Sequence, residues 1–140
     1  MPGQERDKVI LDSGVIAAIF FKEAASERAE RAAETHSLIT LDLAYIEVAN
    51  VAWKRVAIFK ESTELMLKAL KNSSDFITGA CDVLASKELL DDAFKIAVSE
   101  KITIYDSLFV AASEMEKVPL LTTDGKLHEK LNKKWAIRLI

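Results

Sequence analysis

Short apolar runs alternate along the chain with longer segments in which apolar residues recur every three or four positions. The short runs predict strands that are covered on both faces, because such strands are apolar throughout. Arg138 lies in the last run, which places that strand at an edge of the sheet. The five predicted strands are Val9–Leu11, Leu38–Leu41, Cys81–Leu84, Pro119–Thr122 and Trp135–Ile140.

The longer segments predict helices, since a spacing of three or four residues places apolar side chains on one helical face. Ser86 is the expected N-cap of one helix, and Asp106 or Ser107 that of the next. Gly79 is expected to end the helix that precedes them. The seven predicted helices are Val15–Phe20, Ala24–Thr35, Leu43–Lys60, Glu61–Thr78, Lys87–Lys101, a helix that begins near Asp106 and ends at Lys117, and a short helix after Asp124-Gly125.

Strands that alternate with helices predict an α/β protein with a parallel sheet that helices cover on both faces. The length of 140 residues corresponds to a single domain, 1–140, which is long enough to bury its own core. Four glycines and two prolines are few turn formers, which disfavours a sandwich of many short strands. Parallel sheets of this class bind ligands at the carboxyl ends of their strands. The residues that follow each strand are therefore the candidates for function.

The composition argues against several kinds of site. Cys81 is the single cysteine, so the chain forms no internal disulfide. His36 and His128 are far apart, and the four glycines are too scattered for a phosphate-binding loop. The longest apolar run, Val15–Phe21, is much shorter than a membrane-spanning helix, so we expect a cytoplasmic protein with no membrane partner. Acidic residues are the plentiful catalytic material that remains.

Four carboxylates stand at positions that this fold brings together. Asp12 directly follows the first strand, Asp106 lies at a helix start, and Asp124 closes a strand. Glu47 lies in an apolar helix that must pack against the sheet. Taken singly, the aspartates are explained as caps or turn residues, and Glu47 as the partner of a basic side chain. Taken together, converging carboxylates repel one another, and Mg²⁺ or Mn²⁺ relieves that repulsion. Such clusters support metal-assisted hydrolysis of phosphodiesters.

Four short segments carry these acids in a fixed order along the chain. They read Val-Ile-Leu-Asp12-Ser, Ile-Glu47-Val-Ala-Asn50, Thr-Ile-Tyr-Asp106-Ser-Leu-Phe-Val-Ala and Leu-Leu-Thr122-Thr-Asp124-Gly-Lys-Leu. Their order and spacing resemble the PIN domain family, of the kind found in VapC-type toxins of toxin–antitoxin pairs. The resemblance runs from about Lys8 to the C-terminus, with a poor match over Phe76–Leu84.

The resemblance implies a three-layer α/β/α fold around a doubly wound, mainly parallel sheet. It also implies a Mg²⁺- or Mn²⁺-dependent endoribonuclease that cuts RNA, is paired with a small antitoxin protein and forms a homodimer. The catalytic and metal-binding positions that it implies are Asp12, Glu47, Asp106 and Asp124. The supporting positions that it implies are Ser13, Asn50, which would orient Glu47, and Thr122.

Other interpretations stay open at this point. A housekeeping RNA-processing nuclease and a non-catalytic binding domain are alternatives of the same fold. A phosphorelay receiver ranks low because Asp12 has no acidic neighbour, and a haloacid-type phosphatase would need an aspartate where Gly14 stands.

Basic and aromatic residues add further hypotheses. Lys54 and Arg55 are expected to face either RNA or the acids, and Trp53 and Trp135 to lie in the core. The helix Leu43–Lys60 is the expected wall of a groove for the antitoxin. The basic residues near the C-terminus, which either contact RNA phosphates or form a solvated face, are Lys126, His128, Lys130, Lys133, Lys134 and Arg138.

Overall fold

The computed structural model describes residues 6–140, and every predicted strand and helix is present in it. The strands are β1 (Lys8–Leu11), β2 (Ser37–Leu41), β3 (Cys81–Leu84), β4 (Leu120–Thr122) and β5 (Ile137–Leu139). The helices are α1 (Ser13–Phe20), α2 (Ser26–Thr35), α3 (Leu43–Ala57), α4 (Thr63–Ala80), α5 (Leu90–Glu100), α6 (Ile104–Glu116) and α7 (Gly125–Leu131), with a short 3-10 helix η1 (Ser86–Leu89) before α5. Among residues 6–140, none of the helices combines the length and the apolar character that a bilayer crossing requires.

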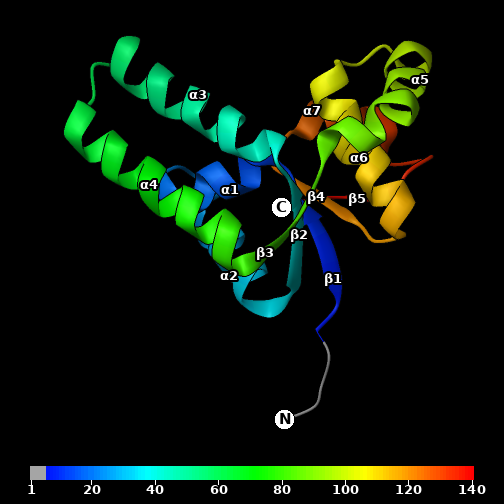
Figure 1. The fold of residues 1–140 in the computed structure, drawn as a ribbon, viewed down its shortest axis with the longest axis horizontal. Coiled ribbons are helices and arrows are strands. Elements are labelled where there is room, and N and C mark those ends of the chain that lie inside the picture. Colours follow the sequence, from blue (N-terminus) through cyan, green and yellow to red (C-terminus); the bar gives the residue numbers. More distant parts are fainter. Residues whose placement is uncertain (1–5) are drawn as a thin grey trace.

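The five strands form one sheet in the order β3-β2-β1-β4-β5, and each neighbouring pair is parallel. Helices α1, α2 and α4 lie on one face of the sheet and α5 and α6 on the other, so the predicted doubly wound α/β/α fold is confirmed (Figure 1). The chain adds β2 and β3 on one side of β1 and then returns to add β4 and β5 on the other. This reversal makes the space beyond the carboxyl ends of β1 and β4 the expected binding site.

The central strands are apolar because helices cover both of their faces. Ile10, Leu11 and Leu120 are fully buried. On one side of the sheet, Phe20 of α1 packs edge-on against Phe76 of α4, with ring centroids 5.3 Å apart. Burial on both faces explains why apolar runs alone are enough to locate the strands.

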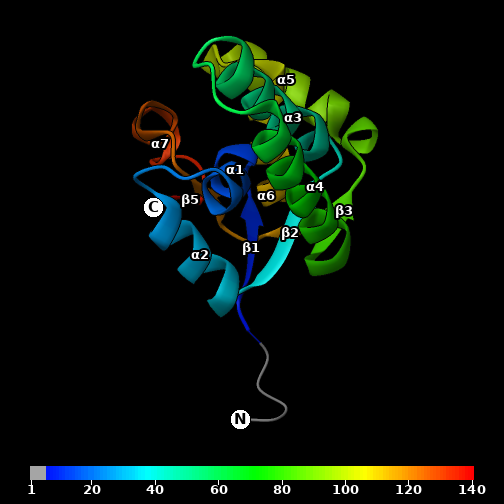
Figure 2. The same cartoon turned by 90° about the vertical axis from the view of Figure 1, so that its left-hand side faces the viewer.

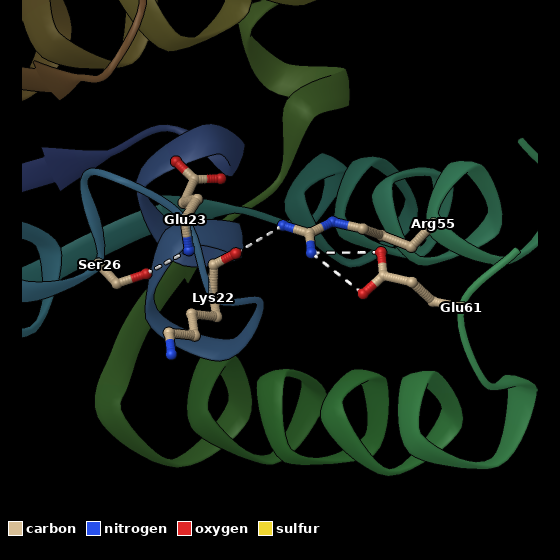
Figure 3. Close-up of polar contacts among 5 residues, drawn as sticks. All are labelled: Lys22, Glu23, Ser26, Arg55 and Glu61. Atoms are coloured by element: carbon tan, nitrogen blue, oxygen red, sulfur yellow. Dashed lines mark hydrogen bonds and ion pairs between the residues drawn. The ribbon is translucent and has the colours of Figure 1, made fainter. Parts of the chain in front are cut away.

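Helices α3 and α4 lie side by side in both views, and together we call them the helical arm, residues 43–80 (Figure 1, Figure 2). Arg55 fixes this arm to the connection between α1 and α2 (Figure 3). Its Nη2 donates to the Lys22 carbonyl oxygen at 3.0 Å, and its Nη1 pairs with Glu61 at 3.3 Å. Arg55 therefore contacts none of the four acids, and the prediction that it faces them is wrong.

The structure corrects the prediction for Trp53, whereas Trp135 packs against the core. Trp53 is 57% exposed, because helical geometry places it on the face of α3 opposite the buried Ala44 and Val48. Trp135 is half-buried against the core, and its indole N–H donates to Glu114 Oε2 at 3.0 Å. Because α3 carries apolar residues on more than one face, its apolar pattern alone does not show that Trp53 is exposed.

Three helix ends also differ from the prediction. Gly79 lies inside α4, which continues to Ala80 and passes straight into β3. Ser86 does not cap a helix, because its hydroxyl and backbone N–H both donate to Asp42 Oδ1. Thr103 caps α6 in place of Asp106 or Ser107, since its Oγ1 accepts the Asp106 N–H at 3.1 Å.

The contact between α4 and the rest of the chain gives a stability prediction. Ile77 of α4 is fully buried, whereas Leu65 of the same helix is 62% exposed. We expect Ile77→Ala to lower the free energy of unfolding by about 2–5 kcal/mol, because it leaves a cavity in the core. Leu65→Ala is the matched control and should cost less than about 1 kcal/mol. Urea unfolding followed by circular dichroism measures both, and equal losses of stability would contradict the described packing of α4.

Candidate active site

Asp12 lies at the point where β1 ends and α1 begins. Its backbone N–H continues the sheet by donating to the Leu121 carbonyl oxygen at 3.3 Å. Its Oδ1 accepts the Val15 N–H at 2.9 Å, so the carboxylate is the N-cap of α1. The structural role that the sequence suggested for Asp12 is thus confirmed. The same cap fixes the carboxylate at the carboxyl edge of the sheet.

Glu47 of α3 reaches the same edge from the helical arm. The Ser13 hydroxyl donates to Glu47 Oε1 at 2.6 Å and joins α3 to the first turn of α1. Within residues 6–140, Asn50 makes no hydrogen bond to Glu47, and its side chain is exposed. The residue that orients Glu47 in this structure is therefore Ser13.

Asp106 and Asp124 complete the group. Because Thr103 caps α6, the Asp106 carboxylate has no capping role and lies in the first turn of the helix. Asp124 is the N-cap of α7, and its Oδ1 accepts the N–H groups of the two residues that follow Gly125, at 3.0 and 3.1 Å. Thr122, fully buried, accepts the Asp124 N–H on its Oγ1 at 3.0 Å and so fixes the turn.

A cavity of about 160 Å³ brings the four acids together at the switch point of the sheet. We call it the acidic cavity. The sequence predicted its four carboxylates and Ser13, but it did not point to three other lining residues. The acidic cavity is lined by Asp12, Ser13, Gly14, Glu47, Asp106, Phe109, Thr123 and Asp124.

Gly14 is one of the lining residues to which the sequence pattern assigned no role. A Cβ atom at this position would stand 2.9 Å from Thr123 Oγ1 and 3.4 Å from Asp12 Oδ1. The first turn of α1 can therefore approach the β4–α7 turn only because residue 14 has no side chain. The sequence feature that could have pointed to this role is the position of Gly14 two residues after Asp12, in a chain that has only four glycines.

The electrostatics of the acidic cavity disfavour the ionised carboxylates. Desolvation is the largest influence on Asp12, and it raises the pKa of this carboxyl to about 6 together with repulsion from Asp106 and Glu47. Hydrogen bonds from Thr122 and Val15 lower the same pKa but do not offset the increase. Desolvation and the charge of Asp106 also raise the pKa of Glu47, although the hydrogen bond from Ser13 lowers it. Desolvation and Asp124 raise the pKa of Asp106. Within residues 6–140, no lysine or arginine forms an ion pair with any of these acids.

The chemistry of this donor set fits a hard divalent cation. All four groups are carboxylates, which Mg²⁺ and Mn²⁺ prefer, and their mutual repulsion would fall if a cation lay between them. Their side chains do not form a ligand cage, since no three Asp, Glu, His or Cys residues of the described chain are arranged to hold a metal. One oxygen each of Asp12, Glu47 and Asp124 accepts a hydrogen bond from the chain itself. Because the four carboxylates are not arranged as a cage, their side chains would have to turn before they held a cation together.

The parallel sheet and its acidic cavity define a class of α/β protein whose carboxylates gather at the strand switch point. Residues 9–133 match the PIN domain family, and the chain belongs to this family. The chain is 39% identical over 127 residues to Ribonuclease VapC3 of Pyrobaculum aerophilum, in an alignment that covers 88% of this chain and 94% of that protein.

Two solved structures share the fold at low sequence identity. VapC20 of Mycobacterium tuberculosis, described as a toxin that cleaves the sarcin–ricin loop, aligns with a TM-score of 0.70 and 13% identity over 91% of this chain and 95% of that one. A toxin–antitoxin complex from Klebsiella pneumoniae aligns with a TM-score of 0.65 and 11% identity over 93% and 95% of the two chains.

The raised pKa of Asp12 predicts how stability changes with pH. The folded chain binds the Asp12 proton more tightly than the unfolded chain, so stability should fall as pH rises from about 4 to about 6. Asp12→Asn keeps the N-cap and removes the charge. In EDTA we expect this variant to gain up to about 3 kcal/mol over the parent across that window, the equivalent of the shift in pKa.

Thermal and urea unfolding at several pH values measure this difference. Addition of Mn²⁺ at pH 7 should stabilise the parent more than the variant, because a ligand that binds the folded state shifts the unfolding equilibrium. A variant that is less stable than the parent at pH 7 in EDTA would show that Asp12 serves only as a cap.

Proposed function

We propose that this protein is a Mg²⁺- or Mn²⁺-dependent endoribonuclease. The observation that carries the proposal is the acidic cavity itself, in which four carboxylates from separate segments lie together without a basic partner in the described chain. The 39% identity to a protein named a ribonuclease supports RNA as the substrate.

The roles of the acids follow from their positions. Asp12, Glu47 and Asp106 would hold the principal cation, and Asp124 would complete or extend the site. When bound, the cation supplies the polarisation of the phosphate and the activation of water for in-line attack on phosphorus. Ser13 holds the Glu47 carboxylate toward the cavity through its 2.6 Å hydrogen bond. No side chain has to act as a nucleophile in this reaction.

A small antitoxin is the proposed partner of this site. A groove of about 280 Å³ runs along the helical arm, and its lining is almost wholly apolar. An apolar helix of a partner would fit such a groove, while a basic side chain of the same partner would form charge-assisted bonds with the acidic cavity. The VapC name of the relative supports this pairing. The groove is lined by Ala49, Ala52, Trp53, Val56, Thr63, Met66, Leu67 and Leu70.

A homodimer in the cytoplasm is the proposed working state. Leu90, Phe94 and Val98 are 45–64% exposed and recur every four residues on α5, which gives this helix an apolar outer stripe. A second copy of the chain would cover such a stripe. Cellular RNA, the proposed substrate, is met in the cytoplasm.

Cleavage assays test the proposed reaction directly. We expect the protein to cut a mixed pool of single-stranded and structured RNAs with Mg²⁺ or Mn²⁺ and to stop in EDTA. Asp106→Asn should lower the rate by more than about 100-fold, because it removes a proposed metal ligand. Asp91→Asn, an exposed acid in the first turn of α5, is the control and should leave the rate unchanged. Cleavage that persists in EDTA would contradict the mechanism.

Growth experiments test the toxin assignment. Expression of the protein alone should slow growth of the host, and Asp12→Ala should restore it, because the substitution removes a proposed metal ligand. Co-expression of the small neighbouring gene should also restore growth, and its product should co-purify with the protein. Normal growth in cells that contain active, RNA-cleaving protein would instead identify a housekeeping nuclease.

A further inference from the structure

A second cavity of about 250 Å³ adjoins the acidic cavity, and Asp106 and Asp124 belong to the walls of both. One wall is the turn between α5 and α6, and the other is α7. We call it the lysine cavity, because three lysines line it and none lines the acidic cavity. The lysine cavity is lined by Lys101, Ile102, Thr103, Asp106, Asp124, Lys126, Leu127 and Lys130.

The three lysines are held at this place by the fold. Lys101 is the C-cap of α5 and takes the left-handed conformation, with φ of 57°. The Lys130 ammonium donates to the Lys101 carbonyl oxygen at 3.1 Å, which links α7 to the α5–α6 turn and leaves two of its three N–H groups for other partners. Within residues 6–140, none of the three ammonium groups forms an ion pair with a carboxylate.

The basic residues near the C-terminus do not all lie at the lysine cavity. Lys134 pairs with Glu100 at 3.2 Å and lines a different cavity, next to Trp135. Only Lys126 and Lys130 of that segment line the lysine cavity, and Lys101 joins them from a part of the sequence that suggested no such role. The positive charge beside the acids is therefore local, although the chain has a net charge of −3.

We propose that the lysine cavity binds an RNA phosphate next to the one that is cleaved. This inference rests on the proposed function. An RNA strand whose scissile phosphate lies in the acidic cavity carries further phosphates one nucleotide away on either side. The lysine cavity adjoins the acidic cavity and shares Asp106 and Asp124 with it, so it can receive one of these phosphates. Ammonium groups bind phosphate as point charges. Lys101, Lys126 and Lys130 thus hold the strand in a fixed position against the repulsion of the carboxylates.

Binding measurements with a charge-matched control test the proposal. The variant Lys101→Asn, Lys126→Gln, Lys130→Gln removes the three charges, and Asn at position 101 tolerates the left-handed backbone. The control Lys117→Asn, Lys68→Gln, Lys95→Gln removes three charges elsewhere. Its Lys117 is the left-handed C-cap of α6, also with φ of 57°, and lies outside the lysine cavity. Both proteins are titrated in EDTA, at several salt concentrations, against a fluorescent pool of random-sequence single-stranded RNA.

We expect the control to bind as the parent does. The lysine-cavity variant should bind RNA more weakly, by roughly fivefold at 0.1 M salt for each phosphate that it no longer neutralises. A plot of the logarithm of the association constant against the logarithm of the salt concentration should also become less steep, by about 0.7 for each such phosphate. With Mg²⁺ it should need more RNA for half-maximal cleavage while its maximal rate is retained. Equal affinities and slopes for the variant and the control would overturn this inference alone. A parent protein that neither binds nor cleaves any RNA of the pool would overturn the proposed function as well.

Discussion

Repulsion among carboxylates at one edge of the sheet is the constraint on which the rest of the structure depends. The four acids come from four separate segments, and desolvation together with their neighbours' charges raises the pKa of Asp12, Glu47 and Asp106. A folded chain gains no stability from such an arrangement at neutral pH. Groups with raised pKa values that line a shared cavity are typical of sites at which a ligand supplies the missing charge.

The fold brings the repelling carboxylates together and also holds them in position. Reversal of strand order between β1 and β4 brings Asp12 and Asp124 to the same crevice. Local hydrogen bonds then fix the anions without neutralising them. Ser13 holds Glu47, and Thr122 holds the backbone N–H of Asp124. The lysine cavity beside the acids adds positive charge from both of its walls, through Lys101 of the α5–α6 turn and Lys126 and Lys130 of α7. The result is a small region with opposite charges in adjoining compartments, which suits a polyanion that must enter an acidic site.

Much of this could be predicted from the sequence, because the central strands β1, β2 and β4 are buried on both faces and therefore appear as apolar runs. The positions that follow those strands then identified Asp12 and Asp124. Contacts between distant segments could not be predicted in this way. The Ser86 hydroxyl bonds to Asp42 of another turn, and Asp42 and Ser86 are 44 residues apart.

The same limit applies to the site and to the helical arm. Gly14 lines the acidic cavity only because the β4–α7 turn packs against α1, and Lys101 meets Lys130 only after α5 and α7 have taken their places. Trp53 is exposed because it lies on the face of α3 opposite the buried Ala44 and Val48, and the apolar pattern of α3 alone does not show which face the rest of the chain covers.

Calorimetric titration with Mn²⁺ shows whether the acidic cavity is a cation site. The parent protein should bind Mn²⁺ with a measurable heat, and Asp12→Asn combined with Asp106→Asn should abolish that binding while the protein stays folded. Asp91→Asn combined with Asp92→Asn removes two exposed acids of α5 and should bind Mn²⁺ as the parent does. Binding that is the same in all three proteins, or absent from the parent, would show that the acidic cavity is not a cation site.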